Sequence, residues 1–176
     1  MTWIDQGQLP VIKPLETSYV GHRFRSRLEA RWAVFFNHLG VPWQYETQGY
    51  LIDGKPYLPD FYLPNDRTYV EVKGDPEQLD MPLLKGFAEH HPLLLLGPIP
   101  DPPAAHQGDL GWLDLSREYR VGFGNYQHKG RLWFQFNTDV DIEHPLRATV
   151  DQYEQGVPNA YIAARSARFE HGERRL

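Results

Sequence analysis

The chain has 176 residues, of which 41% are hydrophobic and 14% aromatic, and its formal net charge is −5. This length and composition suit one globular domain with a proper core and exclude a wholly disordered chain. The acidic balance argues against a protein that coats nucleic acid by bulk attraction. The absence of cysteine excludes disulfides, thiolate zinc sites and cysteine nucleophiles. Because no apolar run approaches the roughly 18 residues of a membrane span and no secretory pattern begins the chain, we expect a cytoplasmic protein without a membrane partner.

The N-terminal part of the sequence predicts an extended arm followed by a helix. Residues 1–19 contain two prolines and show no period, which indicates the arm. Residues 26–40 predict the helix, with Ser26 and Glu29 as a capping box and Gly40 as the left-handed stop. At about 100° per residue, its apolar residues fall on one side: Leu28, Trp32, Phe35, Phe36 and Leu39.

The middle of the chain predicts three strands, a helix and a fourth strand. Strands are expected over 41–52, 56–63 and 68–73, with tight turns at 53–55 and 64–67. Residues 76–91 have helical composition, although Pro82 and Gly86 should kink or split that helix. The apolar run PLLLLGPIP that follows predicts a strand buried on both faces. Strand, helix and strand in this order predict a right-handed parallel crossover.

Beyond residue 97 the chain changes character. A proline-rich connector is followed by three predicted strands, two of them joined as a hairpin at 128–130. Residues 146–172 predict a helix, with Pro158 in a position that suits a first turn. We therefore expect an α/β fold with a central mixed β-sheet flanked by helices. Its parts are an arm (1–19), a core (20–97) in the order α-β-β-β-α-β, and an extension (98–176) that packs on the core.

The segment YLPDFYLPNDRTYVEVKGD, residues 57–75, places Asp60, Glu71 and Lys73 in predicted strands. A carboxylate buried in a strand costs several kcal/mol unless a partner charge or a metal neutralises it. Since residues i and i+2 of a strand share a face, Glu71 and Lys73 project together, and antiparallel pairing brings Asp60 beside Glu71. Two such carboxylates suit a hard divalent cation, with the backbone carbonyl of Val72 as an extra ligand. Glu29 is a further candidate ligand, and Lys73 can hold a water or offset developing negative charge.

Asp60 with a proline before it, followed by Glu71-x-Lys73, resembles the signature of the PD-(D/E)XK nuclease superfamily. Glu29 lies where that superfamily carries its upstream helical acid. The resemblance covers roughly residues 20–97 and implies a restriction-endonuclease-like core. It implies catalytic roles for four residues: Glu29, Asp60, Glu71 and Lys73.

The activity that this resemblance implies is hydrolysis of DNA phosphodiesters by attack of a metal-activated water. Asp60 and Glu71 would be the metal ligands, Lys73 the catalytic lysine, and Mg²⁺ the cofactor, with Mn²⁺ able to substitute. We expect an endonuclease of DNA repair, recombination, restriction or phage DNA processing, encoded by a bacterium or by a phage in a bacterial host. Many members of the superfamily act as dimers, so a homodimer is left open.

Basic residues gather in two clusters that hold eight of the 18 lysines and arginines, one at residues 23–31 and one at 165–175. Phosphate contacts predominate in DNA binding, and arginine suits them. The candidate DNA-binding residues are Arg23, Arg25, Arg27, Lys85, Arg165 and Arg168. For each cluster the alternative is an ordinary solvated face.

Four further residues are weaker candidates for functional roles, and two other functions compete with the nuclease. Glu46 and Gln48 share one face of a predicted strand, and one of them is a candidate for positioning a water. His90 and His91 end a predicted helix, where histidine suits the dipole better than it suggests a metal site. The rival functions are a catalytically inactive nuclease fold that serves DNA docking or assembly, and a structural cation site in a protein that is not a nuclease.

Overall fold

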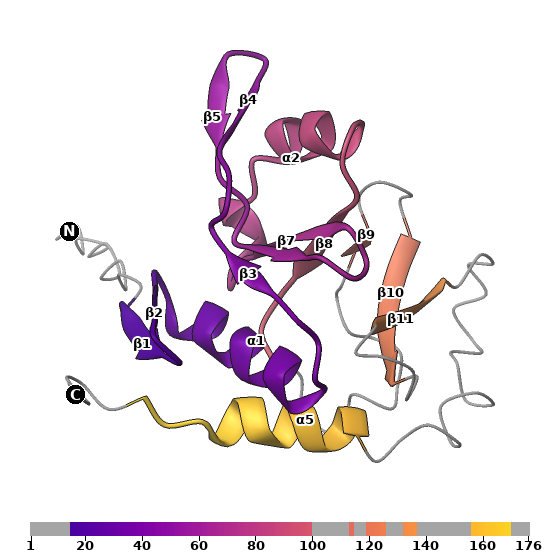
Figure 1. Ribbon diagram of the computed structural model, residues 1–176. Coiled ribbons are helices and arrows are strands. Elements are labelled where there is room, and N and C mark those ends of the chain that lie inside the picture. The colour runs from indigo at the N-terminus through magenta and orange to yellow at the C-terminus, as the bar shows by residue number, and fades with distance from the viewer. Residues whose placement is uncertain (1–14, 100–112, 115–118, 126–131, 137–155, 170–176) are drawn as a thin grey trace, which may run out of the picture.

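The computed structural model describes residues 15–99, 113–114, 119–125, 132–136 and 156–169 (Figure 1). Its architecture is mixed α/β, with a central seven-stranded mixed sheet in the order β11-β10-β9-β8-β7-β6-β3. The strands of this sheet are β3 (Gln44–Tyr45), β6 (Phe61–Leu63), β7 (Thr68–Val72), β8 (Leu93–Leu96), β9 (Leu113–Asp114), β10 (Tyr119–Asn125) and β11 (Leu132–Phe136). Two hairpins lie outside it, formed by β1 (Thr17–Tyr19) with β2 (His22–Phe24) and by β4 (Tyr50–Ile52) with β5 (Lys55–Tyr57).

The strand directions around β7 agree with the sequence predictions. Strand β6 pairs antiparallel with β7, so that Phe61 lies opposite Val70. Strand β7 pairs parallel with β8, and helix α2 (Met81–Ala88) connects the two. The hairpin of β10 and β11 is also confirmed, although its turn at 128–130 lies outside the described residues. Through β9 this hairpin continues the central sheet beyond β8.

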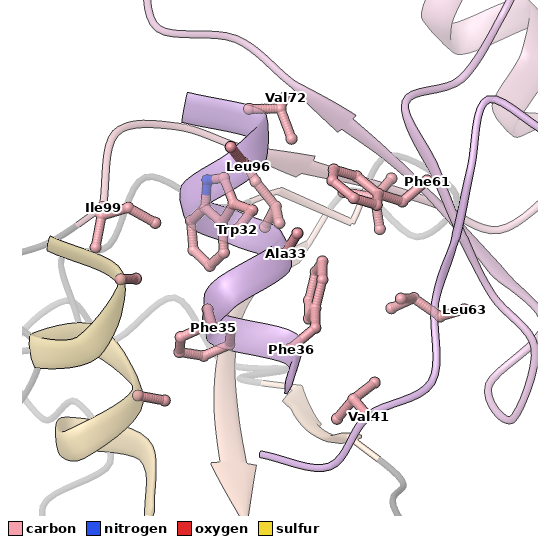
Figure 2. Close-up of a cluster of buried hydrophobic side chains, with 14 of the residues drawn as sticks. Trp32, Ala33, Phe35, Phe36, Val41, Phe61, Leu63, Val72, Leu96 and Ile99 are labelled. Atoms are coloured by element: carbon pink, nitrogen blue, oxygen red, sulfur yellow. The ribbon is translucent and has the colours of Figure 1, made fainter. Parts of the chain in front are cut away.

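Helix α1 (Arg27–His38) forms where the sequence predicts it and anchors one face of the sheet. The Ser26 hydroxyl caps it by accepting the backbone N–H of Glu29 at 3.2 Å, and Gly40 follows with φ +67°. Trp32 is fully buried, and its indole N–H donates to the Gly97 carbonyl at 2.9 Å. Figure 2 shows Phe36 on the side of α1 that faces Phe61 and Leu63 of the sheet. Phe36 meets the ring of Phe61 at a centroid distance of 5.6 Å.

Alternate residues of the central strands serve two separate hydrophobic clusters. From β8, Leu94 and Leu96 join the cluster under α1, whereas Leu93 and Leu95 join the cluster under α2. The prediction that this strand is buried on both faces is confirmed. The smaller cluster is made of Tyr57, Leu84, Phe87, Ala88, Leu93 and Leu95. The sheet is thus covered by α1 on one side and by α2 on the other (Figure 1).

Helix α5 (Gly156–Ser166) packs against α1 and completes the hydrophobic cluster under α1, which is the larger of the two. The rings of Phe35 and Tyr161 stack at 4.8 Å, and Ala160 and Ala164 are fully buried. Pro158 lies in the first turn, as predicted. The predicted helix is too long at its C-terminal end, because α5 ends at Ser166 and residues 167–169 are not helical; its parts at 146–155 and 170–172 lie outside the described residues. The C-terminal segment therefore supplies part of the core that holds α1 against the sheet (Figure 1).

Two predicted strands are wrong in extent, and both breaks shape the candidate site. Residues 41–52 form two short strands in different sheets, because the chain turns at Glu46, whose φ is +46°. Residues 56–63 also form two strands, and the break lies around Pro59, which has no N–H to give to a sheet. The sequence reading also missed the β1–β2 hairpin, whose first strand lies in the predicted arm; residues 1–14 lie outside the described part.

The predicted helix over 76–91 is shorter than expected. A 3₁₀ turn (Pro76–Gln78) precedes α2, which begins after Asp80 and accommodates Pro82 in its first turn, where a missing N–H costs nothing. Gly86 does not split the helix either. An added Cβ there would lie 2.8 Å from Ile52 Cγ2, so the glycine lets α2 pack closely against the β4–β5 hairpin. Within the described residues, no helix is long and apolar enough to cross a membrane.

Candidate active site

Three carboxylates succeed one another across neighbouring strands of the central sheet. The pairing of Tyr45 with Phe61 continues beyond β3, where the Glu46 N–H donates to the Asp60 carbonyl at 3.0 Å. The β6–β7 register, continued by one residue, sets Asp60 opposite Glu71. Like charges directly opposite each other in a sheet repel. The strand pairing thus brings the three carboxylates together at neighbouring ends of β3, β6 and β7. The sequence predicted this juxtaposition for Asp60 and Glu71.

Asp60 is the most deeply buried of these acids, at 1% exposure. Its Oδ2 accepts the backbone N–H of Val72 at 2.7 Å, and its Oδ1 lies 2.6 Å from the guanidinium of Arg25. Burial, and then the negative charges of Glu71 and Glu29, raise the pKa of Asp60 from 3.8 to about 8. The positive charges within reach therefore do not fully offset the cost of an ionised Asp60.

Glu71 and Lys73 form an ion pair within β7 and its continuation. Lys73 Nζ lies 2.7 Å from Glu71 Oε1, which confirms that the two side chains project together. The hydroxyl of Tyr57 donates to the other oxygen, Oε2, at 2.9 Å. Burial works to lower the pKa of Lys73, but the negative charges of Glu71 and Asp60 outweigh it and raise that pKa above its ordinary value. Lys73 is therefore a firmly charged ammonium beside a buried carboxylate.

Glu29 is buried at the start of α1, and both of its oxygens have donors. Oε1 accepts from the Ser26 hydroxyl at 2.7 Å. Oε2 accepts from the Tyr45 hydroxyl at 2.6 Å and from the backbone N–H of Arg25 at 3.1 Å. The carboxylate thus fixes the chain just before the helix. Its charge also reaches Asp60, whose pKa it helps to raise.

Arg25 joins two of the acids instead of pointing into solvent. Its Nη2 lies 2.6 Å from Asp60 Oδ1, and its Nε lies 2.6 Å from Glu46 Oε1. Burial works to lower the pKa of Arg25, yet the charge of Asp60, with smaller contributions from its other neighbours, raises it. Glu46, a candidate for positioning a water, turns out to hold this arginine, whereas Gln48 is exposed beyond it. The backbone of Glu46 has a φ of +46°, a conformation that is uncommon for a non-glycine residue.

The other predicted DNA-binding residues lie on the surface. Arg23 pairs with Glu16, and Arg27 is exposed in the first turn of α1. Lys85 is exposed on α2. On α5, the exposed Arg165 donates to the Ile99 carbonyl at 3.1 Å, and Arg168 is exposed beyond the helix end. Arg25, by contrast, forms ion pairs with Asp60 and Glu46.

Of the two histidines, one lies on the surface and the other packs against aromatic rings. His90 is exposed after α2. His91 packs its ring against Phe87 at 4.7 Å and against Tyr50 at 5.0 Å. Among the described residues, no group of three or more Asp, Glu or His side chains is arranged to hold a metal ion. A cation at this site would therefore rely on two carboxylates, a backbone carbonyl and water.

The chemistry of Asp60 and Glu71 nevertheless fits a hard divalent cation. Both offer buried carboxylate oxygens, and the raised pKa of Asp60 reports negative charge that a cation would offset. Val72 lies against Asp60, and its carbonyl is the predicted third ligand. All four carboxylate oxygens already meet a donor from Arg25, Val72, Lys73 or Tyr57. Because each carboxylate oxygen has more than one lone pair, a cation can share these oxygens with their donors, but it meets the positive charges of Arg25 and Lys73 there.

Sequence reasoning missed three of the contacts that hold the acids in place, from Arg25, Tyr45 and Tyr57. Arg25 and Asp60 are 35 residues apart in the sequence, and no local pattern predicts their contact. Tyr45 and Tyr57 donate to Glu29 and Glu71, respectively. A signal for the tyrosines does exist, because a buried tyrosine hydroxyl needs an acceptor, and nearby predicted strands carry buried acids.

Comparison with known proteins gives no relative from which roles for these site residues could be transferred. No protein-family model matches this sequence, and no curated protein or solved structure matches it either.

Proposed function

We propose that the chain is a metal-dependent deoxyribonuclease built on a restriction-endonuclease-like core. The observation that carries this function is the burial of Asp60 opposite Glu71 on paired strands, with the Lys73 ammonium 2.7 Å from Glu71. The order of elements α1, β3, β6, β7, α2 and β8 also supports it. The spacing of these three residues also resembles the PD-(D/E)XK signature, which is a further reason for this proposal.

In this proposal the chain's own residues divide the work between binding and charge stabilisation. Asp60, Glu71 and the Val72 carbonyl would hold Mg²⁺ or Mn²⁺. When bound, such a cation lowers the pKa of a water and offsets negative charge on the phosphate. Lys73 keeps its proton because its pKa is raised, and its ammonium meets the negative charge that develops on the reacting phosphate. Tyr57 keeps Glu71 oriented by donating to its Oε2.

DNA would approach along the surface in front of α1. Arg23 and Arg27 are exposed on either side of Arg25, and phosphate contacts there would set the position of the backbone. Lys85, Arg165 and Arg168 are more distant candidates for contacts with flanking phosphates. Because the net charge is −5, binding depends on such local groups and should weaken steeply with salt.

An inactive nuclease fold that docks on DNA is the second candidate function. It is favoured by one observation: all four oxygens of Asp60 and Glu71 have protein donors. A site neutralised in this way can persist without a metal. Against it stands the burial of Asp60 beside Glu71, with Glu29 near enough to raise the pKa of Asp60, since a site that never binds a cation gains nothing from buried acids placed together.

Cleavage assays with and without metal separate these functions. Supercoiled plasmid and labelled duplex, single-stranded and junction DNA, together with RNA, are incubated with the protein in Mg²⁺, Mn²⁺ or EDTA. We expect DNA cleavage in either metal and none in EDTA. DNA that is bound but not cut would favour the inactive module. Neither cutting nor binding would favour a structural cation site.

A further inference from the structure

We infer that Arg25 is a displaceable counter-ion: it pairs with Asp60 when no cation is bound, and it leaves Asp60 for a substrate phosphate when a divalent cation binds. This role rests on the proposed function, because it needs both a cation and a polyanionic substrate. It goes further by assigning Arg25 two successive partners. It also makes Glu29 and Tyr45 positioning residues for Arg25.

The guanidinium of Arg25 donates a hydrogen bond to Asp60 Oδ1 at 2.6 Å, yet about half of the Arg25 side chain is open to solvent. The Arg25 side chain is 53% exposed, whereas that of Asp60 is 1% exposed. Its Nε lies 2.6 Å from Glu46 Oε1, yet that oxygen is buried and has no aligned hydrogen-bond partner among the described residues. Solvent screens a half-exposed cation, so its release costs much less than breaking a fully buried pair. Arg25 is therefore the most easily displaced of the donors to Asp60 and Glu71.

The backbone of Arg25, in contrast, is fixed. Its N–H donates to Glu29 Oε2 at 3.1 Å and lies 3.0 Å from the Tyr45 hydroxyl. Tyr45 in turn donates to Glu29, and Ser26 caps α1 directly after Arg25. The long side chain thus pivots from a fixed point beside the acids. If it leaves Asp60, it stays within reach of a phosphate bound at the same edge.

A cation at Asp60 would meet the positive charge of the guanidinium, which lies 2.6 Å from Asp60 Oδ1. Like charges at that separation repel, so cation binding is favoured in molecules from which Arg25 has moved away. If binding requires that state, the apparent affinity for the cation is the intrinsic affinity multiplied by the fraction of such molecules. A guanidinium released by a cation keeps its charge at any ordinary pH, and its planar fork matches phosphate oxygens. Cation binding would therefore also prepare a phosphate contact.

Calorimetry with Mn²⁺ on four metal-free proteins tests the exchange: wild type, Arg25→Gln, Arg67→Gln and Asp60→Ala. Arg67 is the matched control, because it is an exposed arginine at the opposite end of the β6–β7 hairpin. If Arg25 occupies Asp60 about nine-tenths of the time, Arg25→Gln should bind Mn²⁺ roughly tenfold more tightly. Arg67→Gln should match the wild type, and Asp60→Ala should lose binding.

The outcomes separate this role from the proposed function. Wild-type binding that depends on Asp60, with equal or weaker affinity in Arg25→Gln, would overturn the exchange and leave the nuclease intact. No Mn²⁺ binding in either wild type or Arg25→Gln would overturn both. In case Arg25→Gln does not fold, the Nε–H signal of Arg25 is followed by NMR in the wild type during a Mg²⁺ titration. A signal unchanged at saturation would overturn the exchange.

The second partner is tested by DNA affinity in a Lys73→Met background, where cleavage should be slow. Adding Arg25→Gln should weaken DNA binding more in Mg²⁺ than in EDTA, because the guanidinium is held by the acids when no cation is present. An equal loss in both conditions would show that Arg25 does not move from Asp60 to a phosphate.

Discussion

The two buried carboxylates at the centre of the site are neutralised in different ways. Lys73 comes from the same strand segment as Glu71, two residues on, and we call these two residues the Lys73 pair. Arg25 reaches Asp60 from 35 residues earlier and shares its charge with Glu46; we call this contact the Arg25 bridge. The strand's own geometry fixes the first cation, whereas the second depends on how α1 and β2 sit against the sheet. The site therefore combines a built-in charge with one that can be exchanged.

Loss of the Lys73 ammonium should have the largest effect on activity. Lys73→Met keeps most of the side chain's bulk and removes the charge, so folding and DNA binding should be near native. Removing one preorganised electrostatic partner costs on the order of 10²–10³ in turnover, and single-turnover cleavage should fall by at least about a hundredfold. Lys55→Met, on the exposed β5 strand, is the control and should cut like the wild type. Cleavage by Lys73→Met at the wild-type rate would make the Lys73 pair purely structural.

Metal binding should require both halves of the site. We expect Asp60→Ala and Glu71→Ala each to weaken Mn²⁺ binding by at least about tenfold, because even residues that only orient ligands cost about 10- to 100-fold. A Mn²⁺ concentration of 100 times the wild-type Kd should stabilise the wild type by about 2.7 kcal/mol and raise its Tm by several degrees, whereas tenfold weaker binding leaves each variant a gain of about 1.4 kcal/mol or less. Glu77→Ala, an exposed acid before α2, is the control. Unchanged affinity in Asp60→Ala would place the metal elsewhere.

Stability without metal should depend on pH through Asp60. Its pKa is about 8 in the folded protein and 3.8 without its surroundings, so the folded state holds an extra proton between these values. Folding stability from this group is therefore greatest near pH 4 and declines as the pH rises to about 8. In EDTA, the Tm of wild type relative to that of Asp60→Asn should fall by several degrees from pH 5 to pH 8.5. A constant difference would show that the bridge fully neutralises Asp60.

The tyrosines that hold the acids should give the smallest effects. Tyr57→Phe removes a donor from Glu71, and Tyr45→Phe removes one from Glu29. A hydrogen bond to a charged group contributes about 1.5–3 kcal/mol, so urea unfolding should show losses near the lower value in each variant. Tyr62→Phe, whose partly buried ring packs on Tyr69, should change stability by less than about 0.5 kcal/mol. Losses no larger than in this control would mean that neither hydroxyl supports its carboxylate.

The same contrast explains how much of the site could be predicted from sequence. The two-residue period of a strand places Glu71 and Lys73 on one face, and the short turn at 64–67 pairs β6 with β7. Both are local rules, and both hold. Helix α1 follows equally from its apolar spacing and its Ser26 cap. The core of the fold and the Lys73 pair were therefore accessible from the chain alone.

The Arg25 bridge was not accessible, because it joins elements that no local pattern relates. Arg25 was interpreted as a phosphate contact from its place in a basic cluster, whereas the structure turns it toward Asp60 and Glu46. The contact to Glu46 also depends on a left-handed turn at that residue, which β propensity does not predict. Likewise, the break near Pro59 separates Tyr57 from Asp60 and lets the tyrosine reach Glu71.

The central claim, that this site binds a metal and cuts DNA, is tested most directly by measuring cleavage and metal occupancy together. The rate of plasmid cleavage by wild type and by Glu71→Ala is followed across a Mn²⁺ titration and compared with the calorimetric binding curve of each protein. The wild-type rate should rise with the same midpoint as its Mn²⁺ binding, and Glu71→Ala should show neither activity nor binding. Cleavage that persists in EDTA, or that survives undiminished in Glu71→Ala, would contradict the assignment of this site.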